Sequence, residues 1–318
     1  MVATAGHDAL LAYDWEDGFR NAPASADKKP FGANAQLTTK EGSNNAVRLF
    51  EPGDPEAVQI IEQAFDGTFT AEFTLTNPWW LRAVITEASS SGTAPTTHTF
   101  DGFPGDPMRI YTGNEATSTY RELQGAVVQT ATITWNIPGE VTISLDGAYA
   151  FEDADATSFT QPTLNERALS YHDATLTRDD GTATDLQFVQ NLSLTINLNV
   201  DMVDELGTRF AVDYSPKQRN TTIEYERIVQ DTSDQERAYG DATTLQDKVE
   251  NTADFSITTT NGKSGSDTNS VTFEMDDVFP DSVSRSGIGD GSADLTDALT
   301  EAAPTVRAIA ENDTSTAR

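Results

Sequence analysis

Apolar and polar residues alternate with a period of two along two long segments in the middle of the chain. In residues 128–137, the apolar side chains on one face are Ala131, Ile133, Trp135 and Ile137. In residues 189–198, the equivalent face carries Leu192, Leu194, Ile196 and Leu198. This period is typical of half-buried β-strands. The sequence therefore predicts two long strands, each with one side in a hydrophobic core.

The opposite faces of both segments are polar but uncharged, in a chain that is otherwise crowded with carboxylates. These residues are Thr130, Thr132, Thr134, Asn136, Asn191, Ser193, Thr195 and Asn197. Such a face suggests contact with something other than bulk water, which favours an assembly protein over an enzyme. The two segments lie 61 residues apart and share several residue types. Coincidence in a Thr-rich chain and duplication of two halves both remain open explanations.

Shorter segments of the sequence also predict mostly β-strands, with a few short helices. Further strands are expected at 47–50, 68–75, 108–111, 141–145, 221–229, 255–257 and 271–275. A helix is expected near 55–65, where Asp54-Pro55 provides a capping residue and a first-turn proline. A second follows Asn77-Pro78 near 79–86, and a weak third lies near 294–302. A Ser/Thr/Gly loop is expected at 89–97.

The expected fold class is therefore mainly β, a sandwich or barrel with two or three short flanking helices. The regular alternation of helices and strands that builds a parallel sheet is absent. An acidic, Thr-rich stretch at 152–184 marks the subdomain boundary. We expect a first β subdomain at 1–152 and a second at 153–318, with a polar C-terminal tail. The second is pseudo-equivalent to the first if the chain is duplicated.

The charge of the chain is extreme. There are 20 Lys and Arg residues against 51 Asp and Glu residues, a formal net charge of −31. Disorder is disfavoured because 37% of residues are hydrophobic and these are patterned. Dense salt shortens the range of carboxylate repulsion to about 3 Å at 1 M, and negative charge maintains solubility. We therefore expect a folded protein from a high-salt environment.

Several function classes are disfavoured by composition. The absence of cysteine excludes disulfides, thiolate nucleophiles and cysteine-bound metals. No apolar run approaches the roughly 20 residues of a membrane span, and the N-terminus lacks the pattern of a signal peptide. We expect synthesis in the cytoplasm without membrane insertion. The sign of the charge disfavours nonspecific binding to DNA phosphates.

Candidate chemistry is sparse. His7, His98 and His172 have no spacing that would join two of them on one metal, so all three are interpreted as surface residues. The acidic pairs Asp153/Asp155, Asp179/Asp180 and Asp276/Asp277 are interpreted as solvated surface. We expect no catalytic residues, no metal site and no cofactor. Trp79 and Trp80 are either core anchors against the neighbouring strand or anchors of a subunit contact.

Three local patterns resemble the major tail tube proteins of long-tailed, siphovirus-like phages and of haloarchaeal tailed viruses. The first is the aromatic and acidic opening Tyr13-Asp-Trp-Glu-Asp-Gly-Phe19. The second is Gly67-Thr-Phe-Thr-Ala-Glu-Phe73, a strand that leads to the short helix containing Leu81. The third is Met108-Arg-Ile-Tyr111 followed by residues 120–134, in which a glycine precedes the long alternating strand. The resemblance spans most of the chain.

The resemblance implies a tail-tube-type β-sandwich or barrel whose strands join neighbouring subunits into a ring. The inner sheet of such a ring lines a channel, and rings stack through loops and arms into a tube. The eight uncharged polar residues named above are then the candidate channel-lining residues, with the reverse assignment of faces as the alternative. An acidic channel repels DNA phosphates, so the genome passes without specific binding. Three chains could imitate a six-fold ring if the chain is duplicated; otherwise six chains are expected.

The leading hypothesis is a structural virion protein that forms the stacked rings of the tail tube and conducts the genome into the host cell. Its partners are copies of itself and other tail proteins, and its location is the virion tail. The alternative is another β-sandwich structural protein of a halophile, decorating a capsid or forming part of a cell envelope. A secreted hydrolase with paired carboxylates in a cleft would need an export signal and a catalytic motif. Neither is visible, so the sequence predicts no enzyme.

Overall fold

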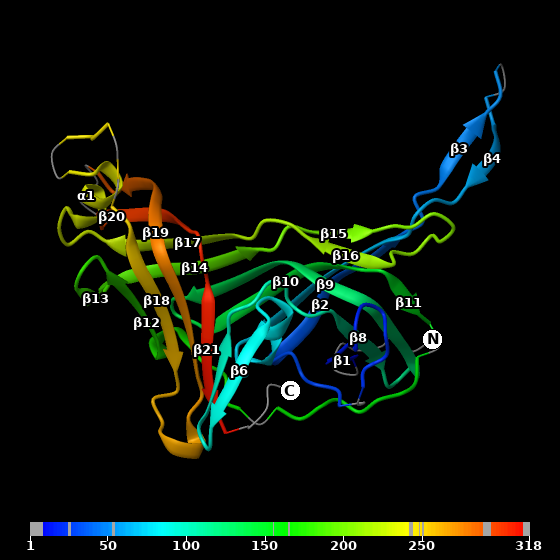
Figure 1. Cartoon of the computed structure of the whole chain (residues 1–318), viewed down its shortest axis with the longest axis horizontal. Coiled ribbons are helices and arrows are strands. Elements are labelled where there is room, and N and C mark those ends of the chain that lie inside the picture. The colour runs from blue at the N-terminus through cyan, green and yellow to red at the C-terminus, as the bar shows by residue number, and fades with distance from the viewer. Residues whose placement is uncertain are drawn as a thin grey trace.

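The computed structural model describes residues 9–24, 27–52, 55–154, 156–164, 166–241, 244–247, 249, 251–288 and 294–313. Most of these residues lie in antiparallel strands (Figure 1). The strands up to residue 153 are β1 (Ala9–Trp15), β2 (Ala33–Ser43), β3 (Val47–Phe50), β4 (Ala57–Ile61), β5 (Asp66–Thr74), β6 (Glu87–Gly92), β7 (Thr96–Phe100), β8 (Met108–Asn114), β9 (Thr119–Asn136), β10 (Val141–Tyr149) and β11 (Phe151–Asp153). A 3-10 helix, η2 (Trp79–Ala83), follows β5.

The later strands are β12 (Ala174–Asp179), β13 (Ala183–Asp185), β14 (Val189–Asn197), β15 (Val200–Val203), β16 (Asp213–Pro216), β17 (Asn220–Ile228), β18 (Ala253–Thr260), β19 (Ser270–Ser286), β20 (Thr296–Ala303) and β21 (Arg307–Asn312). The α-helix α1 (Ser233–Tyr239) follows β17. Two more 3-10 turns, η3 (Tyr171–Asp173) and η4 (Gly265–Asp267), precede β12 and β19. The predicted mainly β class is confirmed.

One large sheet, called here the central sheet, runs through both parts of the chain. Its strands pair antiparallel in the order β2, β5, β10, β9, β14, β17, β20 and β19. Two outer sheets pack against it: β1, β8, β9 and β11 form one, and β13, β12, β18, β19, β21, β7 and β6 form the other. The long strands β9 and β19 each begin in an outer sheet and end in the central sheet.

The hydrophobic core lies on one side of the central sheet. Ala131, Ile133 and Trp135 of β9 are buried, and so are Leu192, Leu194 and Ile196 of β14. The same alternation continues on neighbouring strands, where Ile143, Leu145, Ile223 and Tyr225 are buried. The predicted division of β9 and β14 into an apolar and a polar face is confirmed, because alternate side chains of a strand point to opposite sides of its sheet.

Two predicted helices are wrong. Within 55–65 the structure places β4, which pairs with β3 so that Val47 lies opposite Ile61; Asp54, the predicted cap, lies outside the described residues. The run Val58-Gln-Ile-Ile61 is rich in β-branched side chains, which fit a pleated strand better than a helix. Residues 296–303 form β20 instead of a helix, with alternate side chains buried between β17 and β19.

Other local expectations have mixed outcomes. The helix expected near 79–86 is present as the shorter η2. The loop expected at 89–97 is instead occupied by β6 and β7, which pair with each other. His98 on β7 is therefore not a surface residue: it is fully buried, its ring 5.0 Å from that of Trp79. His172 is exposed, and His7 lies outside the described residues. The boundary at 152/153 stays a prediction.

The two parts of the chain share one strand order. Each part contributes a unit of four neighbouring strands to the central sheet: β2, β5, β10 and β9 in the first unit, and β14, β17, β20 and β19 in the second. In both units the fourth strand along the chain lies between the second and the third. In each unit a hairpin separates the first two strands, β3–β4 in one and β15–β16 in the other. β9 thus corresponds to β19. The 61-residue match, for which coincidence and duplication were both open, joins two neighbouring strands, β9 and β14, rather than two equivalent ones.

Candidate functional site: the polar face of the central sheet

The two uncharged polar faces predicted for residues 128–137 and 189–198 form one surface in the structure. β9 and β14 pair antiparallel, and the pairs on their common polar face are Asn136 with Asn191, Thr134 with Ser193, Thr132 with Thr195, and Thr130 with Asn197. All eight are exposed or half-buried, whereas the residues between them are buried. Neither strand could produce this surface alone, because the sequence fixes which side chains alternate but not which strands meet.

The polar face extends onto the neighbouring strands. Thr142, Ser144 and Asp146 of β10 lie opposite Thr134, Thr132 and Thr130, in that order. On the other side, Thr222, Glu224 and Glu226 of β17 lie opposite Thr195, Ser193 and Asn191. Hydrogen bonds between side chains cross the strands: Asn191 Nδ2 donates to a Glu226 carboxylate oxygen at 2.9 Å. The face is therefore one hydrogen-bonded surface rather than a row of separate residues.

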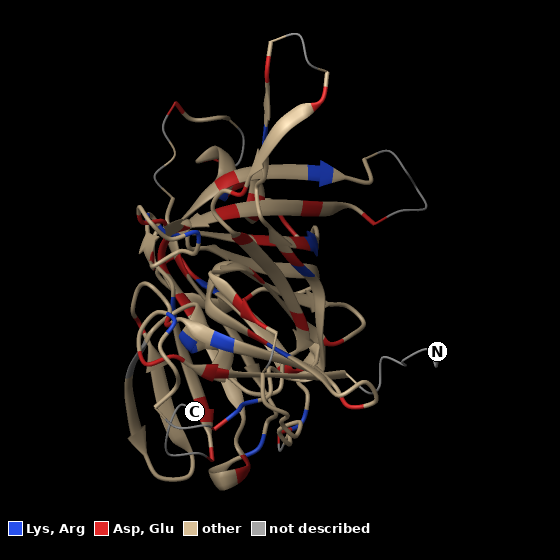
Figure 2. Cartoon of the chain, turned by 90° about the vertical axis from the view of Figure 1, so that its right-hand side faces the viewer, with Lys and Arg blue, Asp and Glu red and all other residues tan. Residues whose placement is uncertain are grey.

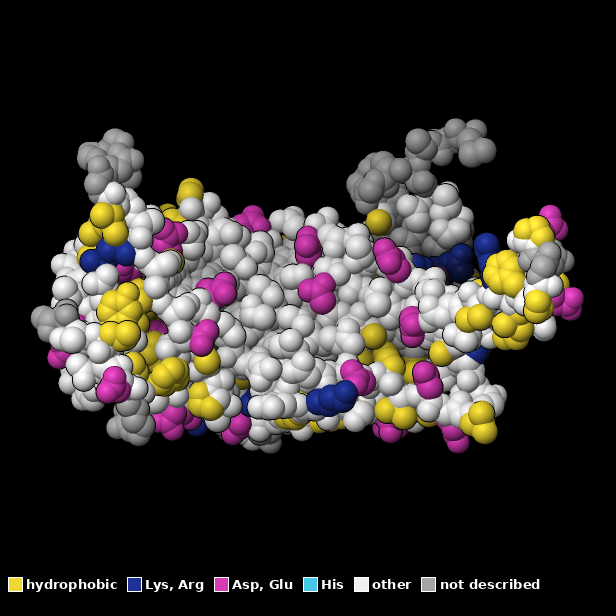
Figure 3. Space-filling model, turned by 90° about the horizontal axis from the view of Figure 1, so that it is seen from above, with side chains coloured by type: hydrophobic (Ala, Val, Ile, Leu, Met, Phe, Trp, Pro, Cys, Tyr) yellow, Lys and Arg dark blue, Asp and Glu magenta, His cyan; other side chains and the backbone are white. Residues whose placement is uncertain are grey.

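Every ionisable side chain among the described residues that pair on this face of β5, β10, β9, β14 and β17 is acidic. The carboxylates are Asp66, Glu72, Asp146, Glu224 and Glu226, with Glu140 just before β10. Figure 2 shows that acidic residues also outnumber basic residues along the strands of the whole molecule. In the view from above, uncharged polar surface dominates and acidic side chains are scattered across it (Figure 3). A phosphate approaching this face would meet carboxylates and hydroxyls without a balancing cation.

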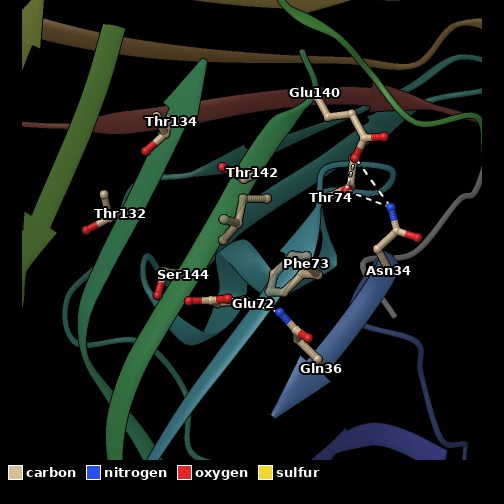
Figure 4. A pocket seen from close by; sticks show the side chains of 11 residues that line it. Asn34, Gln36, Glu72, Phe73, Thr74, Thr132, Thr134, Glu140, Thr142 and Ser144 are labelled. Atoms are coloured by element: carbon tan, nitrogen blue, oxygen red, sulfur yellow. Dashed lines mark hydrogen bonds between the residues drawn. The ribbon is translucent and has the colours of Figure 1, made fainter. Parts of the chain in front are cut away.

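A shallow cavity of about 460 Å³ lies on this face where β2, β5, β10 and β9 meet. Figure 4 shows side chains from these strands turned toward it. At one end, Glu140 accepts hydrogen bonds from Thr74 Oγ1 at 2.5 Å and from Asn34 Nδ2 at 3.4 Å. Gln36 Nε2 donates to Glu72 at 3.1 Å. The lining residues hold carboxylates, amides and hydroxyls with no histidine, lysine or cysteine, so the cavity pairs no hydroxyl nucleophile with an imidazole or amine base.

Buried ion pairs under α1 were missed from the sequence. Asp234 is 1% exposed and bonds to Arg178 at 3.1 Å and to Arg227. Burial raises the pKa of Asp234, while the two guanidinium groups oppose that shift. Arg237 donates two hydrogen bonds to Glu301, at 3.1 and 2.9 Å. These groups lie inside the fold, so they fasten α1 to β12, β17 and β20.

Another buried carboxylate lies where β9 leaves its outer sheet. Glu16 accepts hydrogen bonds from the backbone amides of Arg20 at 2.6 Å and Gly125 at 3.0 Å, and from Arg109 Nε at 3.2 Å. Burial raises the pKa of Glu16, and these donors partly offset the shift. The sequence carried one signal for such groups: charged residues such as Arg227 and Glu301 occupy inward positions of otherwise alternating strands.

Trp79 and Trp80 lie in the core of the chain. They are 4% and 1% exposed, and the Trp80 ring lies 5.9 Å from that of Phe73 on β5. This burial matches the core-anchor alternative and leaves neither ring available to a partner. Among the described residues, no group of three or more His, Cys, Asp or Glu side chains is placed to hold a metal ion; Asp155 lies outside them. No described helix is both long and apolar enough to cross a membrane.

Two solved structures are similar over about half of the chain. One is the anti-feeding prophage baseplate, 16% identical, with a TM-score of 0.32, covering 47% of this chain and 97% of that one. The other is the anti-feeding prophage tube-terminating cap, 18% identical, with a TM-score of 0.33, covering 49% and 95%. No curated protein matches.

A family model carries more weight than these distant structures. The model described as phage tail tube protein matches residues 6–317. That family is structural and non-enzymatic. The chain belongs to the phage tail tube protein family, and it is a structural component of a viral tail.

Proposed function

We propose that copies of this protein form rings that stack into the tail tube, and that the polar face of the central sheet lines the channel through which the genome passes. The observation that carries the proposal is the pairing of β9 with β14. It joins eight uncharged polar side chains into one surface directly opposite a dry core. The polar side of such a sheet suits contact with water in a channel, whereas the apolar side must stay buried within the protein.

The chemistry of the face suits passage rather than binding. Affinity for DNA comes largely from Lys and Arg that neutralise phosphates, and the described positions on the face of β9 and β14 hold neither. Threonine, serine and asparagine hold water by hydrogen bonds, while Asp146, Glu224 and Glu226 repel phosphate. DNA therefore slides along a hydrated, weakly repulsive wall.

We further propose that the virus infects a halophilic host and that the rings require concentrated salt. Assembly brings together chains of net charge −31. At 0.1 M salt their repulsion reaches about 10 Å, and at 1 M about 3 Å. Rings formed in molar salt should therefore dissociate after dialysis to 0.1 M salt.

Electron microscopy of the purified protein in molar salt tests the proposal. Stacked rings with an open centre, seen end-on, are the expected result, with the polar face toward the opening. Globular particles at every concentration would overturn it. A gold-labelled antibody against the chain that marks the capsid of intact virions, rather than the tail, would favour the alternative of a capsid-decorating protein.

A further inference from the structure

The two hairpins occupy equivalent places in the chain. β3–β4 follows β2 and precedes β5, and β15–β16 follows β14 and precedes β17. Their internal registers agree: Arg48 lies opposite Ile60 as Met202 lies opposite Tyr214. The residue numbers of the two hairpins differ by a constant offset, so Ile60 corresponds to Tyr214.

Their surroundings differ. β15–β16 lies along the body of the molecule and contacts β9, whereas β3–β4 projects away from it (Figure 1). The ring of Tyr214 lies 5.6 Å from that of Phe19. Gln129 Nε2 donates to the carbonyl oxygen of Val200 at 2.9 Å. The second hairpin therefore packs against β9 of the first four-strand unit and against the segment that follows β1 in its own chain.

The first hairpin has no such cover. Ile60 is 61% exposed, Phe50 58% and Val58 51%, and Val47, Leu49 and Ile61 are exposed as well. Seen from above, apolar side chains gather at the end of the molecule that carries β3–β4 and at the opposite end, near α1 (Figure 3). A contiguous apolar surface of this kind marks a site of contact with another protein.

The boundary between the two units shows what could cover it. Inside the chain, β9 ends the first unit and pairs with β14, which begins the second. The corresponding outer strands are β19, residues 279–286, and β2. Among the described residues each pairs on one side only, β2 with β5 and this part of β19 with β20. Most of both segments is exposed, and unpaired strand edges are templates for another chain.

We propose that the interface between neighbouring copies repeats the internal boundary. In this interface β2 of one copy pairs with residues 279–286 of the next copy. The β3–β4 hairpin of the first copy then lies on the second four-strand unit of the next copy. The partner is thus a second copy of this chain, joined head to tail so that a closed ring forms. The inference rests on the proposed ring, and it assigns three chains to a ring of six four-strand units.

The internal boundary also gives the register. Thr134 lies opposite Ser193 inside the chain. Following the pairings across each unit, Ser193 corresponds to Thr39, and Thr134 corresponds to Ser286. Thr39 of one copy should therefore lie opposite Ser286 of the next.

The same register brings Lys40 opposite Arg285. Each already has a carboxylate partner, Glu152 at 2.5 Å and Asp297 at 2.6 Å. Their positive charges are therefore neutralised within each chain before the two copies meet. The exposed Phe279 would lie beside the arriving hairpin.

Because the chain has no cysteine, a disulfide can report this register. The test variant carries Thr39→Cys and Ser286→Cys. Within one chain these positions are seven strand spacings of about 4.8 Å apart along the sheet, on the order of 30 Å, too far for a disulfide. Oxidation of rings assembled in molar salt should give two-chain and three-chain species under denaturing conditions, and none larger than three.

Two matched variants serve as controls. Thr134→Cys with Ser193→Cys repeats the pair inside one chain and should yield a monomer with an internal disulfide. Thr39→Cys with Ser282→Cys moves the partner four residues along β19, about 13 Å, and should remain reduced. Rings without a Thr39–Ser286 cross-link, or cross-linked species of four or more chains, would overturn the inference while leaving the proposed function intact. Failure of the wild-type chain to form rings would overturn the proposed function instead.

The hairpin is tested separately. Ile60→Asp should raise the protein concentration needed for ring assembly at least tenfold, because it places a carboxylate in the proposed contact. Leu206→Asp changes a still more exposed residue, in the loop between β15 and β16 of the equivalent hairpin, and should have no effect. Equal thermal unfolding of the two monomers would show that both fold. Normal assembly of folded Ile60→Asp protein would exclude the hairpin from the interface.

Discussion

Trp135 lies directly opposite Leu192, at the point where the first unit of the central sheet meets the second. Its indole Nε1 donates a hydrogen bond to Thr259 Oγ1 at 2.9 Å, which ties the central sheet to β18 in an outer sheet. Both side chains of the pair are buried. One aromatic side chain thus links both units and two layers.

Trp135→Ala should therefore be strongly destabilising. Removing a buried tryptophan costs about 3–5 kcal/mol through lost burial and the cavity left behind. Equilibrium denaturation in molar salt measures the change. Thr132→Ala, on the polar face of the same strand, should change the free energy of unfolding by less than about 0.5 kcal/mol. Equal effects of the two substitutions would contradict the assignment of the buried face.

Asp234→Ala should destabilise the chain by about 3–5 kcal/mol, because it leaves Arg178 and Arg227 buried without their shared carboxylate. Asp180 offers the control: it lies 3.8 Å from Arg178, but its side chain is 59% exposed. Asp180→Ala should cost about 1 kcal/mol or less. Thermal unfolding of the two variants, measured side by side, distinguishes the buried pair from the exposed one. A mild Asp234→Ala phenotype would show that α1 is not fastened by this charge.

Buried tyrosines predict loss of stability at alkaline pH. Burial, assisted by the nearby Glu152 charge, raises the pKa of Tyr149 to about 12, and burial also raises the pKa of Tyr13 and Tyr225. The folded chain then holds these protons more tightly than the unfolded chain, whose tyrosines titrate near pH 10. The stabilisation of the folded state by each protonated tyrosine is complete below pH 10. It is lost by about 1.4 kcal/mol per pH unit as the pH rises toward the folded-state pKa.

Absorbance at 295 nm measures tyrosinate directly. In the folded protein these three side chains should remain protonated at pH 11, and the urea-unfolded protein should titrate near pH 10. The free energy of unfolding should be lower at pH 11 than at pH 9. A folded-state titration identical to the unfolded one would contradict the burial of these rings.

Positive charge on the polar face should hinder the genome. Thr132→Lys with Thr195→Lys places two ammonium groups opposite each other on β9 and β14. Tubes should still assemble, but DNA delivery from virions should fall on the order of tenfold, because each lysine adds a phosphate contact. The matched variant with serine at both positions should behave as wild type. Undiminished delivery through lysine-bearing tubes would place the channel on another surface.

Gly125→Ala should disturb the bend at which β9 passes between its two sheets. Gly125 has φ +64°, and an added Cβ would lie 2.8 Å from Arg20 Cγ and 2.9 Å from the Phe19 ring. Strain and overlap together should cost about 1–3 kcal/mol. Gly181→Ala, also at positive φ but with nothing within 4 Å, should cost less. Denaturation midpoints that match for the two variants would show that the overlap is relieved by movement of the neighbours.

Local pattern was enough to predict most long strands, since a period of two repeats within a few residues. It was misleading at β4, where apolar residues such as Ile60 and Ile61 fit helical spacing and strand alternation alike. It also failed for His98, whose polar neighbours on β7 suggested a loop. In both cases the deciding contact comes from another strand, β3 or β6.

The sequence by itself determined the alternation of β9 and β14, the uncharged polar side chains on one face and the acidic character of the molecule. Tertiary structure alone decided that these strands are neighbours, that β19 rather than β14 is the counterpart of β9, and that Arg227 and Glu301 are buried among carboxylate and guanidinium partners. Strand pairing is made by backbone groups common to every residue. The order of strands therefore leaves little trace in the side chains, whereas the face that each side chain occupies is written into the sequence.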